Sequence, residues 1–282
     1  MDALPARVEL VIFDLDGVVY RGDHPVPGAA ELIARLHRAG VVVRFATNNS
    51  MWTRRDYAAR LRGMGIDAEP GEVVTSASAT AAWLARDAPG VETLLAVGED
   101  GLVREMGEAG YRVTPAAEAA TDGDVDVPTR EWDAVVAGLD RSFEYRRLAL
   151  AAGAVRAGSR FVATNADRRY PTPRGFLPGA GSIVAAIAAA AEVEPEVIGK
   201  PQPGMFLATC EEARVPLGAA LVVGDNPDAD IVAARRAGIA SVLVLTGVAS
   251  AEAASRLAGE RRPDAVVPGP DDVWDRLADR LA

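Results

Sequence analysis

The sequence contains very little cysteine and lysine. Cys210 is the only cysteine among 282 residues, so no disulfide can form within the chain. It lies in a helical pattern without a nearby histidine, and we interpret it as a packing residue. Of the 30 basic residues only Lys200 is a lysine. Because arginine cannot replace lysine where a compact charge must fit a tight space, Lys200 is either a functional residue or a chance survivor on the surface.

Long apolar runs are also absent. The first residues, Met1 to Pro5, lack the basic region and apolar stretch of a signal peptide, so we expect none. The most apolar stretch, Ile183 to Ala191, is far shorter than the roughly 18 residues that a membrane span needs. We therefore expect no membrane partner and a reducing, cytoplasmic setting.

Positive charge is in deficit, and the formal net charge is -10. An acidic surface repels nucleic acid and anionic lipid, which makes both unsuitable partners. The same surface repels phosphorylated small molecules at long range. Any phosphate site must therefore supply its own local positive charge.

Apolar, strand-like runs alternate with helical patterns over most of the chain. This alternation predicts βαβ units and a buried parallel sheet, and so an α/β protein with a Rossmann-like core. The predicted strands are Val8–Phe13, Val41–Ala46, Ala219–Val223, Ser241–Leu245 and Asp264–Val267, and the predicted helices are Ala29–Arg38, Arg54–Met64, Ala229–Ala237 and Val273–Leu281.

The middle of the chain reads as a second α/β layer inserted into the first. Its candidate strands are Leu94–Val97, Ala134–Ala137 and Arg160–Ala163, and Thr121–Pro128 is interpreted as an acidic surface loop. We predict a discontinuous core domain of residues 1–79 and 177–282, with an inserted α/β domain of residues 80–176.

Three predicted strands end on polar residues: Asp14, Thr47 and Asp225. Ligands of such sheets bind beyond the carboxyl ends of the strands. Asp14 and Asp16 flank Leu15, so in extended chain both carboxylates face one side. Two carboxylates this close suit either metal binding or a division of labour between a nucleophile and an acid.

Two other segments could hold phosphate. Thr47 and Asn48 offer hydroxyl, amide and backbone N–H groups before a predicted helix, although Asn49 or Ser50 could simply cap that helix. Lys200 lies between Gly199 and Pro201, where the proline restricts the backbone and helps to aim the ammonium group.

The segment Gly224–Asp230 supplies more carboxylates at a strand-to-helix turn. Oxygen ligands of this kind suit Mg²⁺. We interpret Asp228 as a helix cap, whereas Asp230 is equally compatible with a cap and with a place in the site.

Taken in order, these motifs resemble the haloacid dehalogenase superfamily of phosphatases. The motifs are Asp14-Leu15-Asp16-Gly17, Thr47, Lys200, and Gly224-Asp225 with Asp230. The chain between Asp16 and Thr47 is short, and the chain from Thr47 to Lys200 is long enough for a cap domain. A C2-type cap in that position resembles subfamily IIA, the nitrophenylphosphatase and NagD-like branch.

The resemblance implies catalytic and metal-binding roles. Asp14 attacks phosphorus and forms an aspartyl-phosphate. Asp16 protonates the leaving alkoxide and then activates water. Mg²⁺ is bound by the carboxylates of Asp14 and Asp225 and by the backbone carbonyl of Asp16. Asp230 does not touch the metal directly, and orders a metal-bound water or Lys200.

The resemblance also implies how the substrate is held. Thr47, Asn48 and Lys200 bind the phosphoryl oxygens. Asn165 and Asp167 contact the substrate from a cap loop, in which the branch often has proline where this chain has Ala166. The substrate is a small phosphorylated metabolite such as glycerol phosphate, phosphoglycolate, a nucleotide or a sugar phosphate. A homodimer formed through the cap is compatible with the family.

Two alternatives remain on the same scaffold. One is a phosphomutase, which would depend on a sugar bisphosphate. The other is a catalytically idle regulatory or binding protein, against which the full set of catalytic residues argues.

Overall fold

The computed structural model describes residues 4–120, 131–172 and 175–281. The chain forms two compact units. Unit 1 comprises Met1–Thr47, Arg55–Val74 and Lys200–Ala282, and unit 2 comprises Asn48–Arg54 and Thr75–Gly199. The predicted domain boundaries, before residues 80 and 177, both fall within unit 2, and the division into a core and a cap domain stays a prediction. The predicted acidic loop Thr121–Pro128 lies outside the described residues.

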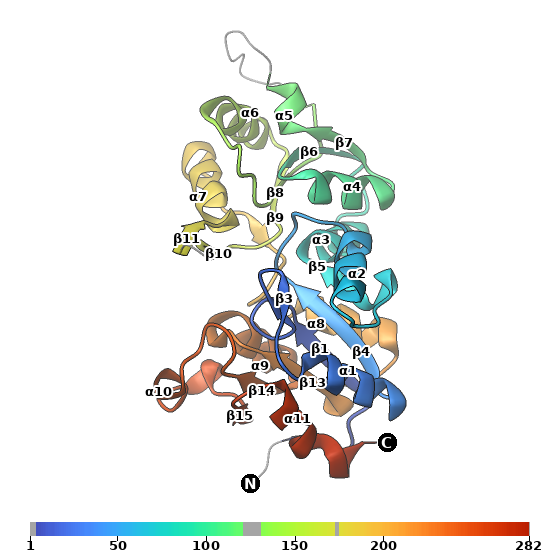
Figure 1. Ribbon diagram of the computed structural model, residues 1–282. Coiled ribbons are helices and arrows are strands. Elements are labelled where there is room, and N and C mark those ends of the chain that lie inside the picture. The colour runs from blue at the N-terminus through green and yellow to red at the C-terminus, as the bar shows by residue number, and fades with distance from the viewer. Residues whose placement is uncertain (1–3, 121–130, 173–174, 282) are drawn as a thin grey trace. The chain divides into compact units, whose positions relative to one another are not determined.

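Unit 1 is built on a sheet with the strand order β15-β14-β13-β1-β4-β5 (Figure 1). Central strand β1 pairs in parallel with β13 and β4, and β14 and β15 continue the parallel pairing beyond β13. The strands are β1 (Leu10–Asp14), β4 (Val42–Thr47), β5 (Val73–Thr75), β13 (Ala220–Gly224), β14 (Ala240–Val244) and β15 (Ala265–Val267). A small hairpin, β2 (Tyr20–Arg21) with β3 (His24–Pro25), follows β1.

Helices cover both faces of this sheet because its strands are apolar on both sides. One core cluster joins strand residues such as Val11 and Phe45 to the buried faces of α1, α2 and α11. Helix α8 contacts β1 and β4, and α9 contacts β14, outside that cluster. The helices are α1 (Ala29–Arg38), α2 (Arg54–Gly63), α8 (Gly204–Ala213), α9 (Val232–Ala237), α10 (Ala251–Ala254) and α11 (Pro270–Leu277), and the shorter helical turns are Pro70–Glu72, Leu217–Ala219, Pro227–Ile231, Gly259–Arg261 and Ala278–Arg280.

Unit 2 has its own parallel sheet, in the order β12-β9-β8-β6-β7. Its inner strands carry short runs of alanine and valine, and α6 and α7 pack together in the cluster that covers one face. The strands are β6 (Thr93–Val97), β7 (Arg112–Pro115), β8 (Ala134–Ala137), β9 (Arg160–Ala163) and β12 (Glu196–Val197), with a separate hairpin of β10 (Arg169–Thr172) and β11 (Gly175–Pro178). The helices are α3 (Ser76–Asp87), α4 (Asp100–Glu108), α5 (Ala116–Ala119), α6 (Tyr145–Arg156) and α7 (Ala180–Ala191).

The α/β class and the parallel-sheet core predicted from the sequence are confirmed. Most predicted elements appear within two residues of their expected ends, and Cys210 is buried in α8 as a packing residue. The helix predicted over Ala229–Ala237 instead begins with a wider, π-helical turn at Pro227–Ile231. Among the described residues, no helix is long and apolar enough to cross a membrane.

The core of unit 1 predicts a large cost for truncating Phe45. Its ring is fully buried, with its centroid 6.4 Å from that of Phe13. Phe45→Ala should lower the free energy of unfolding by about 3–5 kcal/mol, because it leaves a cavity in a packed core. Phe176→Ala, at a side chain that is 67% exposed, is the matched control and should cost less than about 1 kcal/mol. Urea unfolding followed by tryptophan fluorescence measures both, and equal costs would contradict the buried position of Phe45.

Candidate functional site

The polar residues predicted to share one edge of the unit 1 sheet do so. Asp14 ends β1 and pairs in register with Ala46 of β4, while Phe13 pairs with Val223 of β13. Because the three strands are parallel, the residues that follow them emerge at the same edge. Thr47, which ends β4, and Asp225, which follows β13, therefore lie at this edge, and both are buried.

Lys200 lies at the centre of this edge. Its ammonium donates hydrogen bonds to Oδ1 of Asp14 at 2.5 Å, to Oδ1 of Asp230 at 2.7 Å and to the carbonyl of Ala46 at 3.3 Å. Only 2% of the residue is exposed. Burial alone would lower the pKa of Lys200, but the carboxylates of Asp14 and Asp230 raise it well above its usual value. Lys200 is therefore a permanently charged buried cation and not a surface residue.

Three carboxylates gather around this cation. One oxygen each from Asp14, Asp225 and Asp230 lies within 4.8 Å of the others. Burial, with the neighbouring Asp230, raises the pKa of Asp225 to about 7. Burial also raises the pKa of Asp14. Lys200 lowers this pKa, whereas Asp230 and Asp225 raise it further. One ammonium therefore does not balance the cluster, and this set of oxygen donors fits a hard divalent cation such as Mg²⁺.

Asp230 is fixed by the turn that follows β13. Its Oδ2 accepts hydrogen bonds from the backbone N–H groups of Asp225 at 3.2 Å and Asn226 at 3.0 Å. A Cβ at Gly224 would clash with the Asp230 side chain, so glycine is needed for this close approach. Of the two readings left open by the sequence, the structure places Asp230 in the cluster.

The prediction that Asp228 caps the following helix is wrong. Asn226 is the cap, and its Oδ1 accepts from the N–H of Asp228 at 3.0 Å. The side chain of Asp228 is exposed and pairs with Arg261 at 2.8 Å. The wider helical turn begins one residue after Asn226, which leaves Asp228 inside the turn. The other suggested caps, Asn49 and Ser50, precede the start of α2 by several residues.

Asp16 occupies a tight loop beside the cluster. Gly17 has a φ of 87°, and a Cβ there would lie 2.5 Å from Oδ2 of Asp225. This turn brings the backbone of Gly17 against the Asp225 carboxylate. The Asp16 side chain reaches solvent, yet surrounding protein raises the pKa of its carboxyl, while Arg60 and Lys200 act in the opposite direction. Such a group can hold a proton more readily than an ordinary aspartate.

Sequence reasoning missed the loop after β14. The N–H of Val248 donates to Oδ2 of Asp225 at 2.6 Å, and the hydroxyl of Thr246 donates to the carbonyl of Gly17 at 2.6 Å. A Cβ at Gly247 would clash with the Asp225 carboxylate. Nothing in the residue types of Leu245–Val248 indicates that a backbone N–H there holds a carboxylate.

Arg60 on α2 is a second residue that the sequence did not single out. Its guanidinium lies 4.5 Å from the centroid of the Tyr20 ring and donates to the carbonyl of Gly22 and to Oδ1 of Asp23. It therefore fastens the hairpin that follows the Asp16 loop. Arginine is common throughout this chain, so no sequence signal marks this one.

In unit 2, three other predicted residues meet. Asn48, Asn165 and Asp167 form a hydrogen-bonded group in which the Asn48 side chain donates to Oδ2 of Asp167 at 3.0 Å. The Asn165 side chain donates to the carbonyl of Asn48 at 2.7 Å. The structure thus brings the expected cap-loop residues to Asn48.

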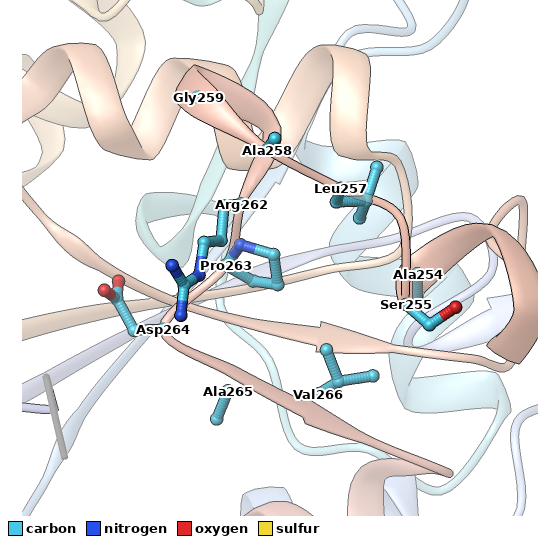
Figure 2. Close-up of a pocket in the computed structure, with 10 residues that line it drawn as sticks. All are labelled: Ala254, Ser255, Leu257, Ala258, Gly259, Arg262, Pro263, Asp264, Ala265 and Val266. Atoms are coloured by element: carbon cyan, nitrogen blue, oxygen red, sulfur yellow. The ribbon is translucent and has the colours of Figure 1, made fainter. Parts of the chain in front are cut away.

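A pocket of about 440 Å³ lies elsewhere in unit 1 (Figure 2). Residues 254–255, 257–259 and 262–266 line it, the last two belonging to edge strand β15. Arg262 and Asp264 are its charged side chains. None of the residues of the carboxylate cluster lines it, so it is separate from the chemistry described above.

Known protein families match two stretches of the chain, which include most of unit 1. The haloacid dehalogenase-like hydrolase model matches residues 11–112, and a related HAD-hydrolase-like model matches residues 197–275. D-glycerol 3-phosphate phosphatase of Mycobacterium tuberculosis is 40% identical over 264 residues, which cover 93% of this chain and 70% of that protein. The chain belongs to the haloacid dehalogenase-like hydrolases.

Other members of this hydrolase family are similar over most of their length. Acid sugar phosphatase of Staphylococcus aureus is 36% identical, covering 86% of this chain and 88% of that protein. The crystal structure of 4-nitrophenylphosphatase from Thermotoga maritima has a TM-score of 0.85 at 32% identity and covers 96% of this chain and 97% of that one. The predicted subfamily IIA assignment is confirmed by these relatives.

One solved relative carries a metal ion. The glycerol phosphate phosphatase of Mycobacterium tuberculosis in complex with magnesium has a TM-score of 0.83 at 35% identity, covering 97% of this chain and 77% of that one. The same protein has also been solved with calcium. Both ions prefer oxygen ligands.

The contacts of Asp230 predict that it supports the fold of the site. Asp230→Ala should lower the free energy of unfolding by about 3–5 kcal/mol, because it removes one partner of a buried ion pair. It also leaves the N–H groups of Asp225 and Asn226 without their acceptor. Asp228→Ala, in the same turn but exposed, should cost less than about 1 kcal/mol. Chemical denaturation of both variants measures the difference, and similar costs would refute the buried role of Asp230.

Proposed function

We propose that this hydrolase is a Mg²⁺-dependent phosphatase that removes phosphate from a small phosphorylated metabolite through an aspartyl-phosphate on Asp14. The observation that carries the proposal is the Lys200 ammonium held between Asp14 and Asp230 beside Asp225. This arrangement offers an anionic nucleophile next to fixed positive charge, which phosphoryl transfer requires. The names of the relatives support the same activity.

The reaction then has two steps. A carboxylate oxygen of Asp14 attacks phosphorus, and the bond to the substrate oxygen breaks as Asp16 donates its proton to the leaving alkoxide. Asp16 next accepts a proton from water, whose oxygen attacks phosphorus. Inorganic phosphate leaves, and the Asp14 carboxylate and the protonated Asp16 are restored. The raised pKa of Asp16 suits a group that must be protonated at the start.

Asp14 and Asp225, with the backbone carbonyl of Asp16, are the residues that would hold Mg²⁺. The ion supplies positive charge to the phosphoryl oxygens when it is bound. Thr47, Asn48 and Lys200 would bind the remaining oxygens, Asn48 being included because it follows Thr47 directly in the chain. The positive charges of Mg²⁺ and Lys200 would attract the phosphate locally, although the chain as a whole has a net charge of -10.

For the substrate we propose a small metabolite of the glycerol phosphate or sugar phosphate type. The support is the names of two relatives, a D-glycerol 3-phosphate phosphatase and an acid sugar phosphatase. Phosphoglycolate and nucleoside monophosphates belong in the same assay panel. The homodimer and the cytoplasmic setting stay predictions.

Hydrolysis of 4-nitrophenyl phosphate tests the proposal directly. The purified protein should release nitrophenolate with added Mg²⁺, and chelation with EDTA should abolish the activity because the carboxylate cluster then lacks its balancing charge. A panel of the metabolites above, assayed by phosphate release, ranks the substrates. Failure to hydrolyse any of these esters would refute the function, and a requirement for a sugar bisphosphate would indicate a mutase.

Substituting Asp14 and Asp16 one at a time should distinguish their roles. Asp14→Asn should abolish turnover, since the amide is not a nucleophile. Asp16→Ala should lower kcat by about 10²–10⁴-fold with little change in KM, which is the usual contribution of general acid–base catalysis. Asp228→Ala is the control and should leave both constants unchanged. Activity retained by Asp14→Asn would rule out the assigned nucleophile.

Lys200→Arg should lose most of the activity although the charge is kept. The ammonium is enclosed by three acceptors, and a planar guanidinium cannot take the same position. Steady-state kinetics and a circular dichroism spectrum distinguish lost function from lost fold. Near-normal turnover in a folded variant would show that Lys200 needs only its charge.

A further inference from the structure

The peptide carbonyl of Asn48 is held by two side chains of unit 2. The hydroxyl of Ser76 donates to it at 2.6 Å and the amide of Asn165 at 2.7 Å. Both donors are buried, with 0% of Ser76 and 4% of Asn165 exposed. A carbonyl with two such donors has both of its lone pairs in use, so the main chain at Asn48 is fixed in direction.

The side chain of Asn48 is oriented from the same place. Its Nδ2 donates to Oδ2 of Asp167 at 3.0 Å. Asp167 is in turn positioned by Asn165, whose Oδ1 accepts from the N–H of Asp167 at 3.1 Å. The side-chain amide of Asn165 therefore donates through Nδ2 to the main chain of Asn48 and accepts through Oδ1 from Asp167, which orients the Asn48 side chain.

The same loop contacts the residue that precedes Lys200. The N–H of Gly199 donates to the carbonyl of Thr164 at 2.8 Å. A Cβ at Gly199 would lie 2.5 Å from that carbonyl oxygen and 2.7 Å from Oδ1 of Asn48. The residues after β9 thus pack against the direct neighbours, along the chain, of both Thr47 and Lys200.

We propose that Asn165 and Asp167 are positioning residues for phosphate binding: they fix Asn48 in the orientation in which it receives the phosphoryl group. This inference rests on the proposed function, and it replaces direct substrate contact as the role of the two residues. Preorganised donors bind an anion more tightly than donors that must first be ordered. The effect concerns the phosphoryl group alone and is independent of the rest of the substrate.

The test compares phosphate affinity with substrate preference. Asn165→Ala and Asp167→Ala should each raise the inhibition constant of inorganic phosphate about tenfold, roughly the effect of one lost charged or buried hydrogen bond. KM should rise by the same factor for glycerol 3-phosphate, a sugar phosphate and 4-nitrophenyl phosphate. Asp167→Asn keeps an acceptor for Asn48 and should restore near-normal constants. Asp87→Ala, at the exposed end of α3, is the control.

The opposite pattern overturns the inference. If the two residues contact the leaving group, KM changes by different factors among the three substrates while the inhibition constant of phosphate stays unchanged. Calorimetric titration of the Mg²⁺-loaded protein with inorganic phosphate gives the affinity without turnover, and Asp167→Ala keeps the test valid should Asn165→Ala fail to fold. A wild-type protein that binds phosphate but hydrolyses no ester would refute the proposed function and leave the affinity comparison intact.

Discussion

The contact on which the site depends is that of one buried ammonium with two carboxylates. Lys200 joins Asp14, at the end of β1, to Asp230, in the turn after β13, and also donates to the carbonyl of Ala46 in β4. Without it, two buried anions would face each other, which costs far more than an exposed pair. The remaining imbalance, visible in the raised pKa of Asp225, is what makes the cluster receptive to a second cation. The same excess of buried negative charge therefore requires Lys200 in the fold and favours binding of a metal ion.

Close approach of the main chain to Asp225 and Asp230 allows the charged side chains to pack this tightly. Gly17, Gly224 and Gly247 each come so close to Asp225 or Asp230 that a side chain would not fit. Backbone N–H groups, which carry no net charge, then stabilise the carboxylates where another cationic side chain would not fit. Three separate loops are thus shaped around two acidic groups. The loops after parallel strands commonly provide sites of this kind because the strands hold their ends rigidly.

Much of this organisation was predictable from the sequence. Apolar runs ending in Asp14, Thr47 and Asp225 define a parallel sheet and the edge where its ligands bind, and a single lysine in an arginine-rich chain stands out. What could not be predicted depends on the backbone. Val248 donates through its backbone N–H, which nearly every residue type has, so its side chain gives no signal. The cap at Asn226 depends on a helical turn wider than the usual one. Arg60 was hidden among many arginines. The link from Asn165 to Asn48 spans 117 positions, beyond the reach of local patterns.

The order of strands in the sheet also has a consequence for how the chain is made. Strand β1 leaves the ribosome before unit 2, whereas its neighbour β13 is synthesised only after the whole of unit 2. The stretch from Thr75 to Gly199 is continuous and contains every strand of its own sheet. It can therefore fold before β1 pairs with β13, and non-local parallel pairing of that kind is slow. The cluster of Asp14, Asp225 and Asp230 around Lys200 therefore cannot assemble until the chain has been synthesised past residue 230, because its members lie on both sides of unit 2 in the sequence.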